Sequence, residues 1–141
     1  MLTELALASA MVLLTVFVHA VGLQLLGRLT RYEWRKEEKL LVEPLSFTAI
    51  MLTMSVVIGL FALHALEIWA YAAVYLELGA VDSLRDAVYF STQTYAAIGF
   101  GDNLLDPDWH LFAAIEGVNG VILLGWSTAF FVTSMRRLGH F

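Results

Sequence analysis

The stretch YFSTQTYAAIGFGDN, residues 89–103, places two glycines on either side of one aromatic residue and an acid directly after them. Gly99 and Gly101 permit left-handed backbone conformations at alternate positions. Such alternation turns successive carbonyl groups to one side, which a ring of cation ligands requires. One chain supplies too few oxygen atoms to surround an ion, so the pattern implies several copies of this loop around an axis.

The composition of the whole chain indicates a membrane protein. Of 141 residues, 60% are hydrophobic and only 15% are charged, which is too little charge for a soluble domain of this length. The chain has no cysteine, so disulfides and thiolate metal sites are excluded. The sequence shows no nucleophile–base pattern, phosphate-binding glycine loop or metal-ligand motif. We therefore expect neither an enzyme nor a nucleic-acid-binding protein, and no cofactor other than ions held in the loop.

Three hydrophobic runs are long enough to cross a bilayer as helices, which takes about 20 residues. They are Leu5–Gly27, Pro44–Leu66 and Gly117–Met135. A fourth uncharged run, Ala87–Gly101, is too short to cross and lies between two spans. We read it as re-entrant, so the predicted fold is an all-α membrane protein with three transmembrane helices, a re-entrant pore helix and a filter loop.

The charges predict an orientation. Basic residues cluster after the first span and after the last, which places both segments in the cytoplasm and the N-terminus outside. The opposite side carries several acids, which would concentrate cations if they line a mouth, or which simply follow topological bias and solvation. The two groups are Arg28, Arg31, Arg35, Lys36, Lys39, Arg136 and Arg137 on one side, and Glu77, Asp82, Asp86, Asp102, Asp106 and Asp108 on the other.

The re-entrant run begins with a helix signal. Ser83 followed three residues later by Asp86 fits a capping box. The uncharged body of this helix then enters the membrane with its C-terminus leading, so its carbonyl end points toward the bilayer midplane.

The motif TQTYAAIGFGD resembles the filter signature of potassium channels, T-x-x-T-V-G-Y-G-D. The order of span, pore helix, filter and span also resembles the pore domain of that family from about Pro44 to Arg137. The resemblance implies a homotetramer whose filter carbonyls bind K⁺, with an extra N-terminal span outside the shared core. It divides the chain into an N-terminal span with a basic linker (1–43) and a pore domain (44–141), which comprises an outer helix (44–78), a pore helix (83–95), a filter (96–102) and an inner helix (109–137). The implied ion ligands are the carbonyls of Ala97, Ile98, Gly99, Phe100 and Gly101.

Two positions depart from the signature. Ala97 replaces the filter threonine, so the innermost ion site keeps a carbonyl but loses a hydroxyl. Phe100 replaces the tyrosine and offers only packing, for example against Tyr89 and Phe90. Support for the filter is expected from side chains of the pore helix and from the filter acid, with Gln93 and Tyr89 as candidate hydrogen-bond partners of that acid; the support residues are Tyr89, Gln93, Thr94 and Asp102.

The last span resembles the inner helix of the same family. Gly120 and Gly125 permit either a hinge or close packing between helices. A face at helical spacing could line an apolar cavity below the filter, although lipid-facing residues would show the same period. That face comprises Val121, Leu124, Thr128 and Val132.

Ionisable residues inside the spans are candidates for function. We expect His64, Glu67 and Glu116 to form an outer polar cluster that braces the pore helix; proton sensing by His64 is the alternative. His19 in the first span is expected to be buried or interfacial.

The predicted function is passive K⁺ conduction across a plasma membrane, or the inner membrane of a bacterium, by a multi-pass protein with a cytoplasmic C-terminus. The alternatives are a weakly selective cation channel, because of Ala97, and a non-conducting sensor or scaffold that uses the pore fold. A transporter is disfavoured because the chain holds one such loop. The expected partners are lipid and three further copies of the chain. Since no voltage-sensor helix or fused ligand-binding domain is evident, gating by a separate regulatory subunit, by pH, by the filter itself or by membrane tension stays open.

Overall fold

A computed structural model describes residues 1–37, 47–100 and 102–137, and within them the chain is helical with no strand. The long helices are α1 (Leu2–Glu37), α2 (Phe47–Glu77) and α4 (His110–Arg137). The short elements are the helix α3 (Leu84–Tyr95) and two 3-10 turns, η1 (Asp102–Leu104) and η2 (Pro107–Trp109). The predicted all-α membrane fold is confirmed.

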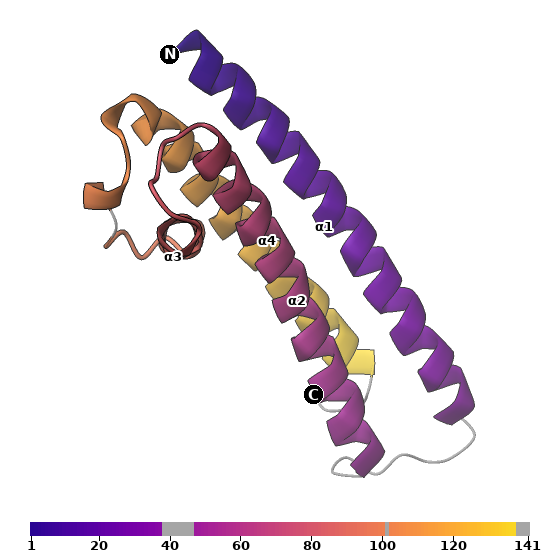
Figure 1. Cartoon of the computed structure of the whole chain (residues 1–141). Helices are drawn as coiled ribbons and strands as arrows, with labels where there is room; N and C mark the ends of the chain where they lie inside the picture. Colours follow the sequence, from indigo (N-terminus) through magenta and orange to yellow (C-terminus); the bar gives the residue numbers. More distant parts are fainter. Residues whose placement is uncertain (38–46, 101, 138–141) are drawn as a thin grey trace.

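The three long helices lie side by side, and α3 with its following loop lies near one end of them (Figure 1). Helices α1 and α4 run in the same direction and α2 runs opposite (Figure 1). Three segments, Leu2–Leu29, Phe47–Glu77 and Pro107–Arg136, are long and apolar enough to cross a membrane. The described basic ends of α1 and α4 therefore fall at the same end of the molecule, as the charge pattern requires.

Helix α1 is longer than the hydrophobic run that predicts it. It continues past Gly27 to Glu37, so the first part of the basic linker is helical. A 36-residue helix is about 54 Å long at 1.5 Å per residue, well beyond the ~30 Å hydrocarbon layer. The rest of the linker, residues 38–46, lies outside the described residues.

The pore helix begins as its sequence indicates. Ser83 is the N-cap of α3, its hydroxyl oxygen accepts a hydrogen bond from the Asp86 N–H at 3.1 Å, and the same hydroxyl donates to the Asp86 carboxylate at 2.7 Å. Four N–H groups at a helix start lack intrahelical partners, and this cap satisfies one of them. The N-cap predicted at Ser83 is confirmed, but the Asp86 carboxylate accepts its hydrogen bond from the Ser83 hydroxyl, so of the two reciprocal bonds of a capping box the one from the Ser83 side chain is observed.

Helix α1 packs directly on α2 through two glycines. The side chain of Leu63 occupies the space beside Gly22, and Leu26 occupies the space beside Gly59, where added β-carbons would lie 2.5 and 2.3 Å from leucine methyl groups. Glycine lets membrane helices approach closely, which strengthens dispersion contacts where no hydrophobic effect operates. The extra N-terminal span is thus fitted to the outer helix.

Helix α4 holds the end of α3 through Gly120. A β-carbon at this position would lie 2.2 Å from the carbonyl oxygen of Tyr95, the last residue of α3. Because the opposing atom belongs to backbone, no side-chain rotation relieves the contact. Of the two roles predicted for Gly120, the geometry matches close packing, and α4 continues through this position as one helix.

Substitution of this glycine tests the contact. We expect Gly120→Ala to force α3 away from α4 and to destabilise the protein by about 1–3 kcal/mol, the usual cost of overpacking. The measurement is the thermal midpoint in detergent. Gly125→Ala is the matched control, because a β-carbon there meets no described atom within 4 Å. Equal midpoints for the two variants would contradict the proposed packing.

Candidate ion pathway and its supporting network

The filter loop leaves the pore helix through a defined C-terminal cap. The N–H of Ile98 donates to the Gln93 carbonyl at 2.8 Å, and the N–H of Ala97 donates to the Thr94 carbonyl at 2.9 Å. This pair of bonds is the Schellman pattern, in which the residue after the cap adopts the left-handed conformation. That residue is Ala97, with φ of 54°.

Left-handed conformations recur along the loop. Ala97 and Gly99 both have positive φ, 54° and 78° respectively, and the residue between them does not. Glycine adopts this conformation freely, whereas alanine does so at a cost. The alternation predicted for the loop is therefore present at 97 and 99, one step earlier than the glycine pair. Gly101 lies outside the described residues.

One side chain braces the loop from behind. The Gln93 side chain is 8% exposed, and its Oε1 accepts a hydrogen bond from the Phe100 N–H at 3.0 Å. The sequence suggested Gln93 as a partner of Asp102, whose side chain lies outside the described residues. The observed bond ties the middle of the filter loop to the pore helix that carries it.

The two large side chains of the filter are uncovered within one chain. Phe100 is 81% exposed and Ile98 is 52% exposed. Phe90, suggested as a packing partner of Phe100, is instead buried edge-on against Tyr75, with ring centroids 5.1 Å apart. Tyr89 is itself about half exposed. The protomer alone therefore does not enclose its filter loop.

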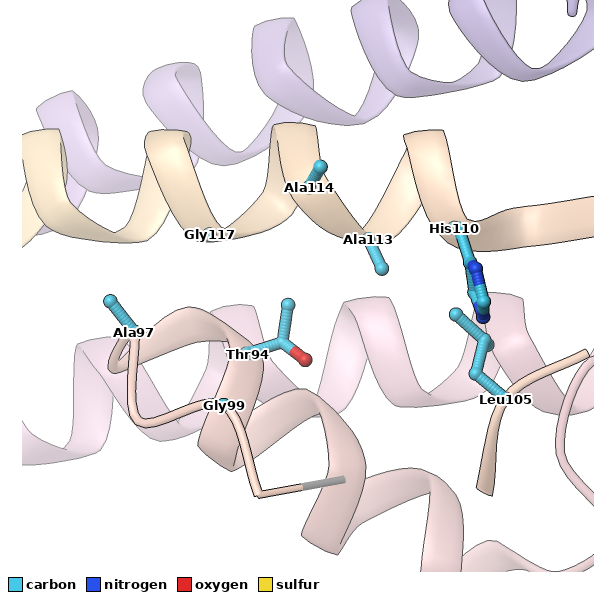
Figure 2. A pocket seen from close by; sticks show the side chains of 8 residues that line it. All are labelled: Thr94, Ala97, Gly99, Leu105, His110, Ala113, Ala114 and Gly117. Carbon is cyan, nitrogen blue, oxygen red and sulfur yellow. The ribbon is translucent and has the colours of Figure 1, made fainter. Parts of the chain in front are cut away.

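An open cavity of about 390 Å³ separates the filter loop from the start of α4. Thr94 and Ala97 point from the loop side toward α4, and Ala113 and His110 point back from α4 (Figure 2). The wall on the α4 side is made mostly of alanine and glycine. The cavity lining comprises Thr94, Ala97, Gly99, Leu105, His110, Ala113, Ala114 and Gly117.

Helix α4 has one covered and one uncovered face. Leu123 and Ser127 are buried against the same chain. The predicted cavity face is exposed, with Val121, Leu124 and Val132 uncovered and the Thr128 hydroxyl donating to the Leu124 carbonyl at 2.9 Å. A helix with its second face free inside one chain is available to line a shared pathway.

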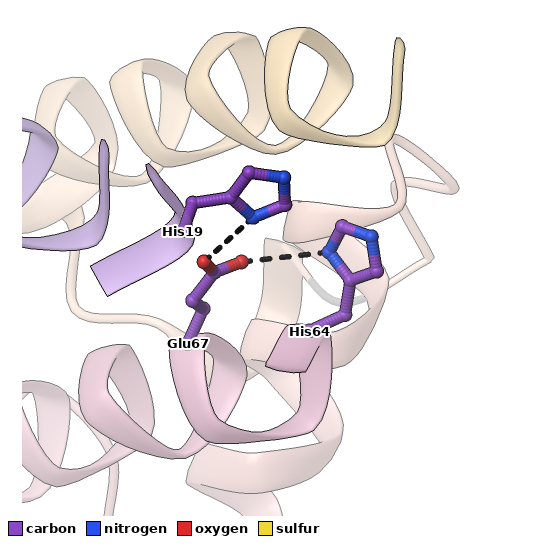
Figure 3. A group of neighbouring side chains, drawn as sticks. All are labelled: His19, His64 and Glu67. Carbon is purple, nitrogen blue, oxygen red and sulfur yellow. Dashed lines mark hydrogen bonds and ion pairs between the residues drawn. The ribbon is translucent and has the colours of Figure 1, made fainter. Parts of the chain in front are cut away.

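A polar network connects all four helices at the C-terminal end of α3. The carboxylate of Glu67 in α2 lies 2.9 Å from Nδ1 of His19 in α1 and 3.4 Å from Nδ1 of His64 (Figure 3). Tyr95, at the end of α3, donates its hydroxyl hydrogen to Glu67 and lies 2.9 Å from His64 Nδ1. Ser127 in α4 completes the network, its Oγ lying 2.9 Å from His64 Nε2 and 3.2 Å from His19 Nε2.

Glu116 belongs to a different network. Its carboxyl group accepts hydrogen bonds from Ser91 of α3 at 2.6 Å and from Tyr75 of α2 at 2.5 Å. The expected cluster of His64, Glu67 and Glu116 is thus divided between two sites. Glu67 and Glu116 are both essentially unexposed. Each accepts a hydrogen bond from a hydroxyl of α3, Tyr95 for Glu67 and Ser91 for Glu116.

A third buried contact again involves the first span. Asn119 of α4 donates to the Thr15 hydroxyl at 2.8 Å and to the Tyr71 hydroxyl at 3.3 Å. Together with His19, this places two polar side chains of α1 against α2 and α4. Sequence reasoning did not assign these partners, because each pair lies tens of residues apart and no local spacing reports them.

These features define a class of membrane protein: three helices of spanning length, with a short capped helix packed on α2 and α4 that leads into a loop with left-handed residues at 97 and 99. Residues 62–137, more than half of the chain, match a protein-family model described as "Ion channel". The chain belongs to this ion channel family. No curated protein and no solved structure matches the chain.

The brace from Gln93 is directly testable by amide hydrogen exchange. Gln93→Leu removes the acceptor of the Phe100 N–H, and a hydrogen bond of this kind contributes about 0.5–1.5 kcal/mol. We expect exchange at the Phe100 amide to become roughly 2- to 13-fold faster, measured by mass spectrometry or NMR.

Gln93→Glu is the matched control for this experiment. It retains a side-chain oxygen at the same distance from the backbone, so protection of the Phe100 amide should stay near the wild-type level. Similar exchange rates in the wild type and in Gln93→Leu would show that Gln93 does not hold the loop.

Proposed function

We propose that this ion channel conducts K⁺ passively through a filter formed by residues 96–102. The observation that carries the proposal is the loop itself, which starts at the capped C-terminus of the short helix α3 and alternates left-handed residues at 97 and 99. Backbone that is not helical at membrane depth is tolerated where it is buried in protein or lines a wet pathway. Carbonyl groups of such a loop replace the water shell of a cation.

The charges near the loop support a cation rather than an anion. Exposed acidic side chains lie at the end of α2 and in the segments before α3 and before α4: Glu77, Asp82, Asp106 and Asp108. Basic residues, apart from Arg85, lie elsewhere in the sequence. Acids near an entrance raise the local concentration of cations.

We further propose a homotetramer around the filter. Four-fold symmetry follows from the resemblance to potassium channels, and the exposed surface of one chain is consistent with it. Phe100, Ile98 and the free face of α4 are apolar and uncovered in the protomer. Neighbouring copies would cover them and would close the cavity beside the loop.

The proposed setting is a plasma membrane, or the inner membrane of a bacterium, with the N-terminus outside and the C-terminus in the cytoplasm. The positive ends of α1 and α4 support this orientation. The uncovered outer surface of α2, with Phe61 and Ile58 among its exposed residues, suits contact with lipid. A separate subunit for gating remains part of the proposal.

Ala97 gives specific support to a second candidate function, a weakly selective cation channel. This alanine lacks the hydroxyl of the filter threonine and sits in the helix cap with φ of 54°. A threonine at this position would restore the hydroxyl but would place a β-branched residue in a left-handed conformation, at a cost of about 1–3 kcal/mol. A substitution that restores the hydroxyl at position 97 therefore also strains the backbone there.

The experiment is a reversal potential in reconstituted bilayers with K⁺ on one side and Na⁺ on the other. We expect the wild type to reverse close to the K⁺ equilibrium potential, because the carbonyl sites above Ala97 remain. Ala97→Gly should behave like the wild type, since glycine adopts positive φ without strain.

The Ala97→Thr variant separates the two candidate functions. A wild-type reversal near zero that this variant moves toward K⁺ would favour the weakly selective channel. Absence of current from folded wild-type and Ala97→Gly protein would favour a non-conducting sensor or scaffold. Loss of current in Ala97→Thr alone would be the result of strain at the helix cap.

A further inference from the structure

The network of His19, His64 and Glu67 has the composition and geometry of a metal site. Each residue offers one ligand atom, and the three ligand atoms lie within 4.8 Å of one another. The two imidazole rings are adjacent, with centroids 5.3 Å apart. The carboxylate of Glu67 lies between them and faces Nδ1 of both rings (Figure 3). His19 and Glu67 are completely buried.

A count of hydrogens shows that the network is incomplete by itself. Five contacts form a closed ring, Glu67 to His19 to Ser127 to His64 to Tyr95 and back to Glu67. An ionised carboxylate supplies no hydrogen, and each hydroxyl and each neutral imidazole supplies one. Four hydrogens therefore serve five contacts, and one contact joins two acceptors.

The missing hydrogen can be located at Ser127. If both histidines donate from Nδ1 toward the Glu67 side, both Nε2 atoms are acceptors, and they face a serine hydroxyl that has one hydrogen. A buried acceptor without a donor costs about 1–3 kcal/mol. The ring therefore needs one more positive charge, which either a proton on one imidazole or a cation bound among the ligand atoms would supply.

We propose that His19, His64 and Glu67 bind a single divalent transition-metal ion of the zinc class. The Tyr95 hydroxyl would occupy the fourth ligand position. In this arrangement both Nδ1 atoms turn their lone pairs to the ion, and each ring keeps its hydrogen on Nε2. Both Nε2–H groups then donate to Ser127 Oγ, which has two lone pairs. Each histidine moves its hydrogen from Nδ1 to Nε2, so no proton has to leave.

The ligand types select the kind of ion. Two imidazole nitrogens and a carboxylate oxygen suit Zn²⁺ and its first-row neighbours, whereas Ca²⁺ and Mg²⁺ prefer oxygen alone. Metal-bound histidines usually donate their second N–H to a fixed acceptor, which sets the ring orientation. Ser127 is placed to serve both rings, from a helix that contributes no ligand.

The ion would join the first span to the filter. His19 lies in α1, His64 and Glu67 lie in α2, and Tyr95 ends α3 two residues before Ala97. A metal bound here would fix the relative positions of three helices at the base of the filter loop. The extra N-terminal span would then help to hold α2 and α3 in place through its ligand His19.

The test is Co²⁺ titration of the full-length protein in detergent, after chelator treatment and removal of the chelator. We expect one Co²⁺ per chain with visible d–d absorption, displaced by Zn²⁺, and a rise in thermal midpoint with bound metal. His19→Ala should lose the absorption. His110→Ala is the matched control, because His110 is exposed and lies outside the network.

A second variant keeps the test decisive if His19→Ala does not fold. Ser127→Ala retains all three ligand side chains and removes only their shared acceptor, so Zn²⁺ affinity should fall about 10- to 100-fold. Folded wild-type protein without Co²⁺ absorption would overturn the proposal, as would absorption that survives His19→Ala or an affinity unchanged in Ser127→Ala. Because metal binding is read without ion flux, these outcomes leave the proposed conduction untouched.

Discussion

Hydrocarbon offers no hydrogen-bonding partner, so every polar group that this fold places inside the bilayer must find one within the protein. The carboxyl groups of Glu67 and Glu116 are the most demanding of these groups, since both are buried. Each is reached by a hydroxyl from the pore helix, Tyr95 in one case and Ser91 in the other. The short helix α3 is thereby fixed to α4 at its middle and to α2 at its end.

This fixation explains how a twelve-residue helix keeps a defined place in the membrane. Its N-terminus is capped by Ser83, and its last carbonyl packs against Gly120 of α4. Its C-terminal cap then passes directly into the filter loop through Ala97. The loop is consequently an extension of a rigid element, with Gln93 of the same helix holding the Phe100 N–H.

The sequence predicted the elements well because each has a local signal. Each of these signals lies within one continuous stretch of sequence. They are the hydrophobic runs of spanning length, the Ser83–Asp86 capping pattern and the glycine-rich loop. The sites were harder, because their contacts join distant positions. His19 and Glu67, or Asn119 and Thr15, meet only through helix packing, and no spacing along the chain reports such pairs. The division of Glu67 and Glu116 between two networks is of the same kind: both lie deep in spans, but they face different donors.

The contacts of the first span, α1, are the clearest example of what the sequence did not predict. By pattern alone, α1 is a hydrophobic helix outside the shared pore core. In the structure Thr15 and His19 enter the core, bonding Asn119 and Glu67 respectively, while Gly22 admits Leu63 of α2. Removing α1 would leave Asn119 with one of its two partners and would leave Glu67 and Ser127 each without the His19 ring. Since unmatched polar groups are costly in hydrocarbon, the buried polar contacts of α2 and α4 depend on a segment that precedes the matched family region.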